Sequence, residues 1–163
     1  MDYILGDEGS GYSIGLKGLR AVMKTYDGRG KNTLLSGKIL ENLKLKNIQE
    51  LMKWVYSKTP VKEKIAELGK VVCNTAELND KISIRILKEE SMEAVITIEA
   101  VIKKLRLEDK DFDLVLVGSV FKCKKYFKYV LYKKLNGKFP KINYKPLIKK
   151  PVEGAIRLAI ENL

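Results

Sequence analysis

A continuous apolar run at residues 113–121 constrains this chain more than any other feature of its sequence. Such a run, rich in Val and Leu, is typical of a strand that is buried on both faces of a parallel sheet. It breaks at Gly118 and Ser119, and a lysine-rich helical segment follows. Residues 141–145 then favour a second strand, and Pro151 opens a last helix. The last third is therefore predicted to be a β-α-β-α unit with parallel strands and a right-handed crossover.

The rest of the chain is predicted to be mostly helical. Residues 3–5 read as the end of a strand and lead into a glycine-rich loop at residues 6–11. Apolar spacing predicts helices at residues 12–26, 33–45, 47–57, 60–75, 80–107 and 152–163. The buried stripe of the long helix is predicted to be Ile82, Ile86, Ala94, Ile98, Val101, Ile102 and Leu105. We expect one domain, residues 1–163, of a helix-rich α/β class with a small, partly parallel sheet.

Most of the net charge lies in one segment. Lys and Arg total 32 against 20 Asp and Glu, so the net charge is +12. Residues 122–150 contain 11 of the basic residues and no acidic one, interleaved with aromatic residues. A segment of this kind can bind nucleic acid through charge and stacking. The alternative is an amphipathic helix with solvated lysines, because apolar residues recur at helical spacing. These residues are Cys123, Phe127, Val130, Leu131 and Leu135.

The chain has no histidine and two cysteines. The lack of histidine excludes His-dependent catalytic triads, His general bases and the common zinc sites. Cys73 and Cys123 have no CxxC spacing, so we expect reduced, mostly buried thiols and a cytoplasmic protein. The first residues are acidic, and no apolar run approaches the roughly 20 residues that span a bilayer. The sequence therefore predicts neither a signal peptide nor a membrane segment.

The turn that follows the apolar run is a candidate nucleotide site. Small residues there lead from a strand into a helix, which leaves backbone N–H groups free to attract phosphate. The candidate residues are Gly118, Ser119, Phe121 and Lys122. Turns of this kind occur in every α/β protein, so a purely structural role stays open.

The glycine-rich loop at residues 6–11 is a second candidate site. Its glycines permit a left-handed backbone and a close approach of a ligand. Asp7 and Glu8 can accept hydrogen bonds from hydroxyl groups or hold a metal ion. A flexible turn without a ligand is the alternative.

Several motifs together resemble the block shared by N-acetylglucosamine kinases and the BadF/BadG/BcrA/BcrD ATPase family. The first part of the block is Gly6-Asp7-Glu8-Gly9-Ser10-Gly11-Tyr12, then Ile14-Gly15, then Asp27-Gly28-Arg29-Gly30 with Thr33-Leu35. The later parts are Asn79-Asp80 before the long helix, Gly118-Ser119-Val120-Phe121 after the strand, and Pro151-Val152-Glu153-Gly154-Ala155 at the last helix. The resemblance covers the whole chain and corresponds to the C-terminal part of the family's length.

The resemblance implies the actin-like, hexokinase-like (ribonuclease H-like) fold, in which two lobes close over ATP. This chain would be the C-terminal lobe. Asp7, with Gly6 beside it, matches the loop aspartate that hydrogen-bonds sugar hydroxyls. Gly118 and Ser119 match the glycine pair that contacts adenosine. Two residues depart from the pattern: Ser119 adds a side chain where the second glycine stands, and Ser13 replaces a tryptophan.

The resemblance also implies that the chain holds only part of the machinery. The family's N-terminal lobe, with a phosphate loop and the catalytic aspartate, and the second phosphate loop are expected to lie outside this chain. We therefore assign no catalytic residue and no metal ligand. The intact enzyme would transfer the γ-phosphoryl group of ATP, with Mg²⁺, to a hexosamine hydroxyl. The chain alone is expected to be inactive and to need no cofactor of its own.

The expected partners are an adenine nucleotide and an amino sugar, bound weakly, and either a second copy of the chain or the missing N-terminal lobe. Two other functions stay open. One is an ATPase that activates a dehydratase or reductase through an iron–sulfur cluster, although the two cysteines lack the paired spacing of cluster ligands. The other is a nucleic-acid-binding or protein-interaction domain that uses residues 122–150.

Overall fold

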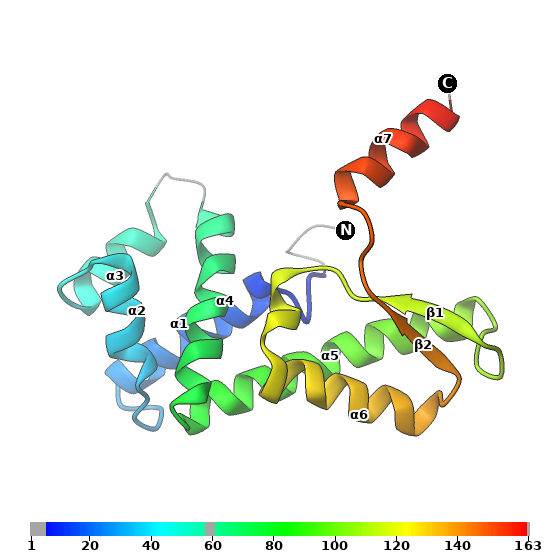
Figure 1. The fold of residues 1–163 in the computed structure, drawn as a ribbon. Helices are drawn as coiled ribbons and strands as arrows, with labels where there is room; N and C mark the ends of the chain where they lie inside the picture. Colours follow the sequence, from blue (N-terminus) through cyan, green and yellow to red (C-terminus); the bar gives the residue numbers. More distant parts are fainter. Residues whose placement is uncertain (1–5, 58–60, 163) are drawn as a thin grey trace.

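The computed structural model describes residues 6–57 and 61–162 of the chain (Figure 1). In chain order the elements are α1 (Gly11–Tyr26), α2 (Leu35–Leu43), α3 (Ile48–Val55), α4 (Val61–Glu77), α5 (Lys81–Lys104), β1 (Phe112–Val115), α6 (Tyr129–Lys138), β2 (Ile142–Lys145) and α7 (Pro151–Glu161). This confirms the predicted helix-rich α/β class with a small parallel sheet. The strand expected at residues 3–5 lies outside the described residues. Of the described helices, none is long and apolar enough to cross a bilayer.

Helices α1 and α4 cross in close backbone contact. A Cβ atom on Gly15 of α1 would overlap the carbonyl oxygen of Ile65 in α4. A Cβ atom on Gly69 of α4 would lie 2.9 Å from the carbonyl oxygen of Gly11. Because a larger residue at either position would force the helices apart, these glycines fix the crossing. The first turn of α1 is thereby held against α4, directly after the loop at residues 6–10.

Asp80 joins the start of α5 to the start of α2. Its Oδ1 accepts the Ser83 N–H at 2.8 Å and so caps α5, while its Oδ2 accepts the Leu34 N–H at 3.0 Å. The Thr33 hydroxyl donates to the same carboxylate at 3.0 Å. Burial by itself raises the pKa of the Asp80 carboxyl, but the hydrogen bonds outweigh burial and hold this pKa below its usual value.

The buried face of α5 differs in part from the predicted stripe. Ile82, Ile86 and Ile102 are buried as expected, whereas Val101 and Leu105 are 53% and 59% exposed. The observed stripe also passes through polar residues that an apolar pattern leaves out. The buried polar side chains within α5 are Ser83, Glu90 and Ser91. The Ser91 hydroxyl donates to the carbonyl oxygen of Phe127, 2.9 Å away, and so links α5 to the basic segment.

Strands β1 and β2 pair in parallel, as predicted, with Phe112 opposite Ile142 and Leu114 opposite Tyr144. Burial alternates along both strands, so only one face of this sheet packs on the core. The other face is open, and Val115 is 42% exposed. The prediction of a strand buried on both faces is therefore wrong. A continuous apolar run allows a strand to be buried on both faces, but here no described element covers the second face of the sheet.

The basic segment is not one regular helix. It consists of a 3-10 turn (η1, Ser119–Lys122), a π-helical turn (η2, Lys124–Lys128) and α6, and α6 continues through Gly137 instead of ending at Asn136 and Gly137. The predicted apolar stripe is nevertheless confirmed. Cys123, Phe127, Leu131 and Leu135 are buried, and Val130 is half-buried.

Helix α7 has no packing partner among the described residues. Figure 1 shows it projecting away from the other helices and the sheet, and each of its described side chains is exposed. Pro151 begins the helix as predicted. Its large apolar side chains are between 55% and 67% exposed, namely Val152, Ile156, Leu158 and Ile160.

Candidate functional site

The loop that carries Asp7 is a tight turn at the N-terminus of α1. Asp7 and Gly9 both have left-handed backbone, with φ of 78° and 77°. The N–H of Ser10 donates to the carbonyl oxygen of Asp7 at 3.1 Å and closes the turn. The Ser10 side chain then caps α1 by accepting the Ser13 N–H at 3.1 Å. Asp7 itself is exposed and Gly6 is half-buried, so the carboxylate is accessible from solvent.

The turn after β1, residues 116–123, is called the Gly118 corner here. Gly118 has a φ of 133°, which a residue with a side chain rarely adopts. The chain then forms η1, in which Ser119 and Lys122 are exposed. Phe121 is half-buried and its ring lies edge-on to the ring of Phe127, with 5.8 Å between centroids. Phe121 therefore anchors the corner to the core.

A cavity of about 360 Å³ lies between the Gly118 corner, the first turns of α1, and α4. We call it the corner cavity. Its lining residues are Gly11, Ile14, Ala66, Glu67, Gly69, Lys70, Cys73, Asn74, Leu87, Ser119, Val120, Lys122 and Cys123. Of the predicted nucleotide residues, Ser119 and Lys122 line it, whereas Gly118 and Phe121 do not.

The two predicted sites do not share the corner cavity. Asp7 and Gly6 are not among its lining residues. They belong to the loop that runs into α1, whose Gly11 and Ile14 form one wall of that cavity. The first turns of α1 therefore connect the loop at residues 6–10 to the wall of the corner cavity.

Sequence reasoning missed the polar side chains that α4 contributes. Glu67, Lys70 and Asn74 line the corner cavity at spacings of three and four residues, which places them on one face of α4. A solvent-facing helix surface has the same pattern, so the sequence offered no signal that separates the two. Among residues 6–57 and 61–162, no group of three or more His, Cys, Asp or Glu side chains is placed to hold a metal ion.

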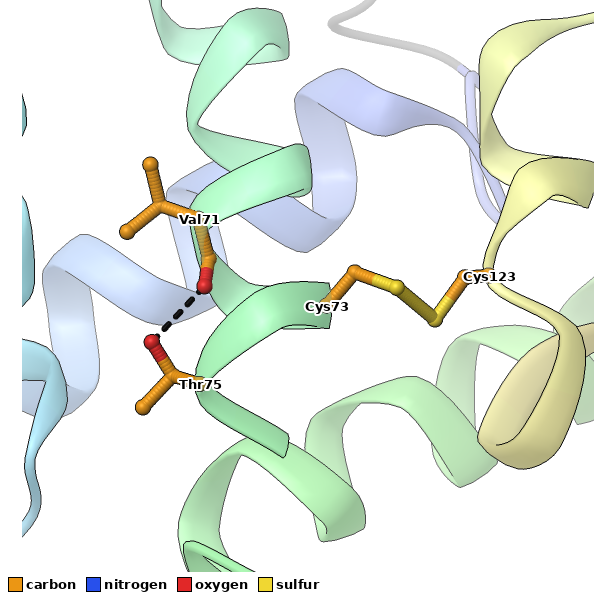
Figure 2. The surroundings of a disulfide bond; sticks show 4 residues. All are labelled: Val71, Cys73, Thr75 and Cys123. Atoms are coloured by element: carbon orange, nitrogen blue, oxygen red, sulfur yellow. Dashed lines mark hydrogen bonds between the residues drawn. A yellow bond between two sulfur atoms is a disulfide. The ribbon is translucent and has the colours of Figure 1, made fainter. Parts of the chain in front are cut away.

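Cys73 and Cys123 form a disulfide at the edge of the corner cavity. Figure 2 shows the bond running from α4 to the segment that follows η1. The Cα atoms are 5.9 Å apart, although 50 residues separate them in sequence. One turn of α4 around Cys73 also has the Thr75 hydroxyl donating to the Val71 carbonyl oxygen at 2.7 Å (Figure 2). The expectation of two reduced thiols is therefore wrong, because spacing along the chain cannot reveal this approach in space.

The basic segment offers few aromatic rings for stacking. Tyr126, Phe127 and Phe139 are buried, whereas Tyr129 is 63% exposed. Lys138 pairs with Glu99 of α5 at 2.6 Å. Tyr132 and Tyr144 are half-buried, with their ring centroids 4.2 Å apart. The segment therefore has the buried stripe and the mostly solvated lysines of the amphipathic interpretation, and nucleic-acid binding by it stays open.

Comparisons with known proteins agree with the motifs. The profile of the BadF/BadG/BcrA/BcrD ATPase family matches residues 1–159. The N-acetylmuramic acid/N-acetylglucosamine kinase of Clostridium acetobutylicum is 36% identical over 157 residues, which are 96% of this chain and 51% of the kinase. The N-acetyl-D-glucosamine kinase of Dictyostelium discoideum is 35% identical over 161 residues, 98% of this chain and 50% of that protein.

The fold agrees as well. A crystal structure described as that of an N-acetylglucosamine kinase from Chromobacterium violaceum superimposes with a TM-score of 0.72 at 19% identity. The match covers 96% of this chain and 49% of that one. The chain therefore spans about half the length of the relatives that it matches, and it belongs to the BadF/BadG/BcrA/BcrD ATPase family.

Proposed function

We propose that this chain is the nucleotide- and sugar-facing lobe of an N-acetylglucosamine kinase-like enzyme. The observation that carries the proposal is the family match over residues 1–159, together with two hexosamine kinases that are 35% and 36% identical over nearly the whole chain. The intact enzyme would transfer a phosphoryl group from ATP to a hydroxyl of an amino sugar. The structure supports this by exposing Asp7 and by forming a cavity beside Ser119.

The corner cavity suits the adenosine part of ATP. Its volume of about 360 Å³ is at the lower end of the roughly 300–1,000 Å³ usual for small-molecule sites. Ser119, Lys70 and Asn74 are among its polar lining residues, beside the charged Glu67 and Lys122, and the rest of the lining is mainly apolar. Gly118 sets the direction of the backbone there, and Phe121 holds the corner in place.

Asp7, with Gly6, would accept hydrogen bonds from the hydroxyls of the sugar. ATP supplies the phosphoryl group when it is bound, together with Mg²⁺, for which we assign no ligand in this chain. Phosphoryl transfer also needs a group that orients the attacking hydroxyl and donors that hold the phosphates. We assign neither to this chain, so we expect it to be inactive by itself.

The exposed face of α7 supports a role as part of a larger fold. Three large apolar side chains recur at every fourth residue of α7, namely Val152, Ile156 and Ile160, and each is more than 50% exposed. An exposed apolar face of this kind usually marks an interaction site. Because the chain spans only half of its relatives, we assign this face to the other half of the kinase fold and not to a second copy.

A cytoplasmic location also stays a prediction, since a disulfide is uncommon there unless it takes part in redox chemistry.

The nucleotide role is tested by titrating the chain with Mg·ATP and following its backbone amides by NMR. The shifts are expected to centre on Ser119, Val120 and Lys70. Ser119→Trp would fill the corner cavity and should weaken binding at least about tenfold, the order of one lost polar contact. The control is Thr97→Trp, at an exposed position of α5 that is not in the cavity lining.

Two results would contradict the proposal. One is unchanged ATP binding by the Ser119→Trp variant. The other is tight binding of a single-stranded oligonucleotide at about 150 mM salt that is lost when Lys124, Lys125 and Lys128 are changed to glutamine. The second result would favour the nucleic-acid function of residues 122–150 instead.

A further inference from the structure

Glu90 is a carboxylate in the core of the protein, beneath the loop that carries Asp7. It lies on α5 and is 1% exposed. Its Oε2 accepts the backbone N–H of Gly9 at 2.7 Å, and its Oε1 is 2.7 Å from the ammonium group of Lys17 on α1. A buried charge is tolerated only when it is paired and hydrogen-bonded, and here each oxygen has a partner.

The same loop touches α5 at a second point, one turn further along the helix. Gly9 is buried, and a Cβ atom at this position would lie 2.9 Å from Cβ of Ala94. Glu90 and Ala94 are four residues apart and therefore lie on the same face of α5. The backbone of Gly9 is thus held by a hydrogen bond at one point and by packing at the next.

The other half of the anchor is Lys17. Its ammonium group also lies 3.5 Å from Glu89, and its side chain is 35% exposed. Burial lowers the pKa of Lys17, but the hydrogen bond and the charge of Glu90, followed by those of Glu89, outweigh burial and raise this pKa overall. Lys17 therefore stays charged and can turn toward Glu89 if the charge at position 90 is removed.

Asp7 needs an external restraint of this kind. Its φ of 78° is a left-handed conformation that residues with a side chain adopt only at a cost, so the loop alone does not favour it. Gly9 follows two residues later, and fixing its N–H limits how far Asp7 can move. We infer that Glu90 is a positioning residue, which holds the loop at residues 6–10 in the conformation that presents Asp7 to the amino sugar. This inference rests on the proposed function of Asp7.

Two variants of Glu90 distinguish the effect of its side-chain length from the effect of its charge. Glu90→Asp keeps the charge for Lys17 but withdraws the oxygen from Gly9 by one methylene group. Glu90→Gln keeps the reach and an acceptor oxygen for Gly9 but removes the charge. If the hydrogen bond to the loop is what matters, the aspartate variant should lose function and the glutamine variant should retain it. A role limited to the ion pair with Lys17 predicts the opposite order.

The full chain would be titrated with N-acetylglucosamine, and the exchange rate of the Gly9 amide would be measured by NMR. Glu90→Asp should speed Gly9 exchange and weaken sugar binding, each by about tenfold, the order of one hydrogen bond to a charged group. Glu90→Gln should stay within about threefold of the wild type in both. Glu89→Gln is the matched control, because Glu89 contacts Lys17 but accepts no hydrogen bond from the loop in the structure.

The possible failures are distinguishable. If the wild-type chain binds no sugar, or if Asp7→Asn leaves binding unchanged, the proposed function of Asp7 fails, and the positioning role fails with it. If Asp7→Asn weakens binding while Glu90→Asp does not, the positioning role alone is overturned. Unchanged Gly9 exchange in Glu90→Asp would overturn the anchor itself.

Discussion

Asp80 and Glu90 are two buried carboxylates of the α5 region, and each accepts a hydrogen bond from the backbone just ahead of another helix. Asp80 accepts the N–H of Leu34 before α2, and Glu90 accepts the N–H of Gly9 before α1. These bonds join residues 46 and 81 positions apart in sequence. Two side chains, one at the start of α5 and one within it, therefore hold the backbone that leads into α2 and α1.

Replacing Asp80 with alanine should lower the free energy of unfolding by about 3 kcal/mol, because α5 loses its cap and buried donors lose their acceptor. Asp80→Asn keeps one oxygen and should cost about half as much. The measurement is urea unfolding at about pH 7, followed by circular dichroism. Lys81→Ala, on the neighbouring exposed residue, is the control and should change stability by less than about 0.5 kcal/mol.

The same residue predicts a pH dependence with a definite sign. The folded-state pKa of Asp80 is lowered, so its contribution to stability is complete above the ordinary Asp pKa of about 3.9 and is lost as the pH falls toward the folded value. The stability difference between the wild type and Asp80→Asn should therefore be smaller at about pH 3 than at about pH 7. A difference that is the same at both pH values would show that the charge of Asp80 does not stabilise the fold.

At the scale of elements, regular pieces were predicted well and their contacts were not. The spacing of apolar residues located the five helices α1 to α5 within three residues at each end, and Pro151 located the start of α7. The spacing missed the break of the basic segment into η1, η2 and α6, because the buried residues keep helical spacing through the π-helical turn. Among the candidate site residues, the motifs singled out Asp7 and Ser119, whose roles stay predictions, and they did not single out Glu90. Its position, four residues after Ile86 on the buried stripe, was the available signal.

The disulfide ties α4 to the Gly118 corner and should contribute to stability chiefly by closing a loop. For a separation of 50 residues, the chain-entropy estimate is about 4 kcal/mol. Cys73→Ser should lose this amount in urea unfolding without reductant, and adding reductant should destabilise the wild type but not the variant. Finding two free thiols per chain in the unreduced, unfolded wild type would contradict the disulfide.

At the scale of the whole molecule, two surfaces remain open among the described residues. One is the outer face of the β1–β2 sheet, and the other is the apolar face of α7. Both are surfaces that a larger fold would cover, and the chain spans about half of each relative. The family could be recognised from the motifs in the sequence. The open faces could not, because a hydrophobic pattern shows what is to be buried but not which polypeptide covers it.

The role proposed for this chain is that of the nucleotide- and sugar-facing lobe of a hexosamine kinase. The most direct measurement is sugar-dependent ADP release from Mg·ATP, for the chain alone and for a fusion with the part of the Clostridium acetobutylicum kinase that this chain does not match. We predict no turnover by the chain alone, turnover by the fusion, and loss of that turnover with Asp7→Asn. Sustained release by the chain alone at about 1 s⁻¹, the low end of kinase turnover, would contradict the account, as would a folded fusion that binds ATP and never phosphorylates the sugar.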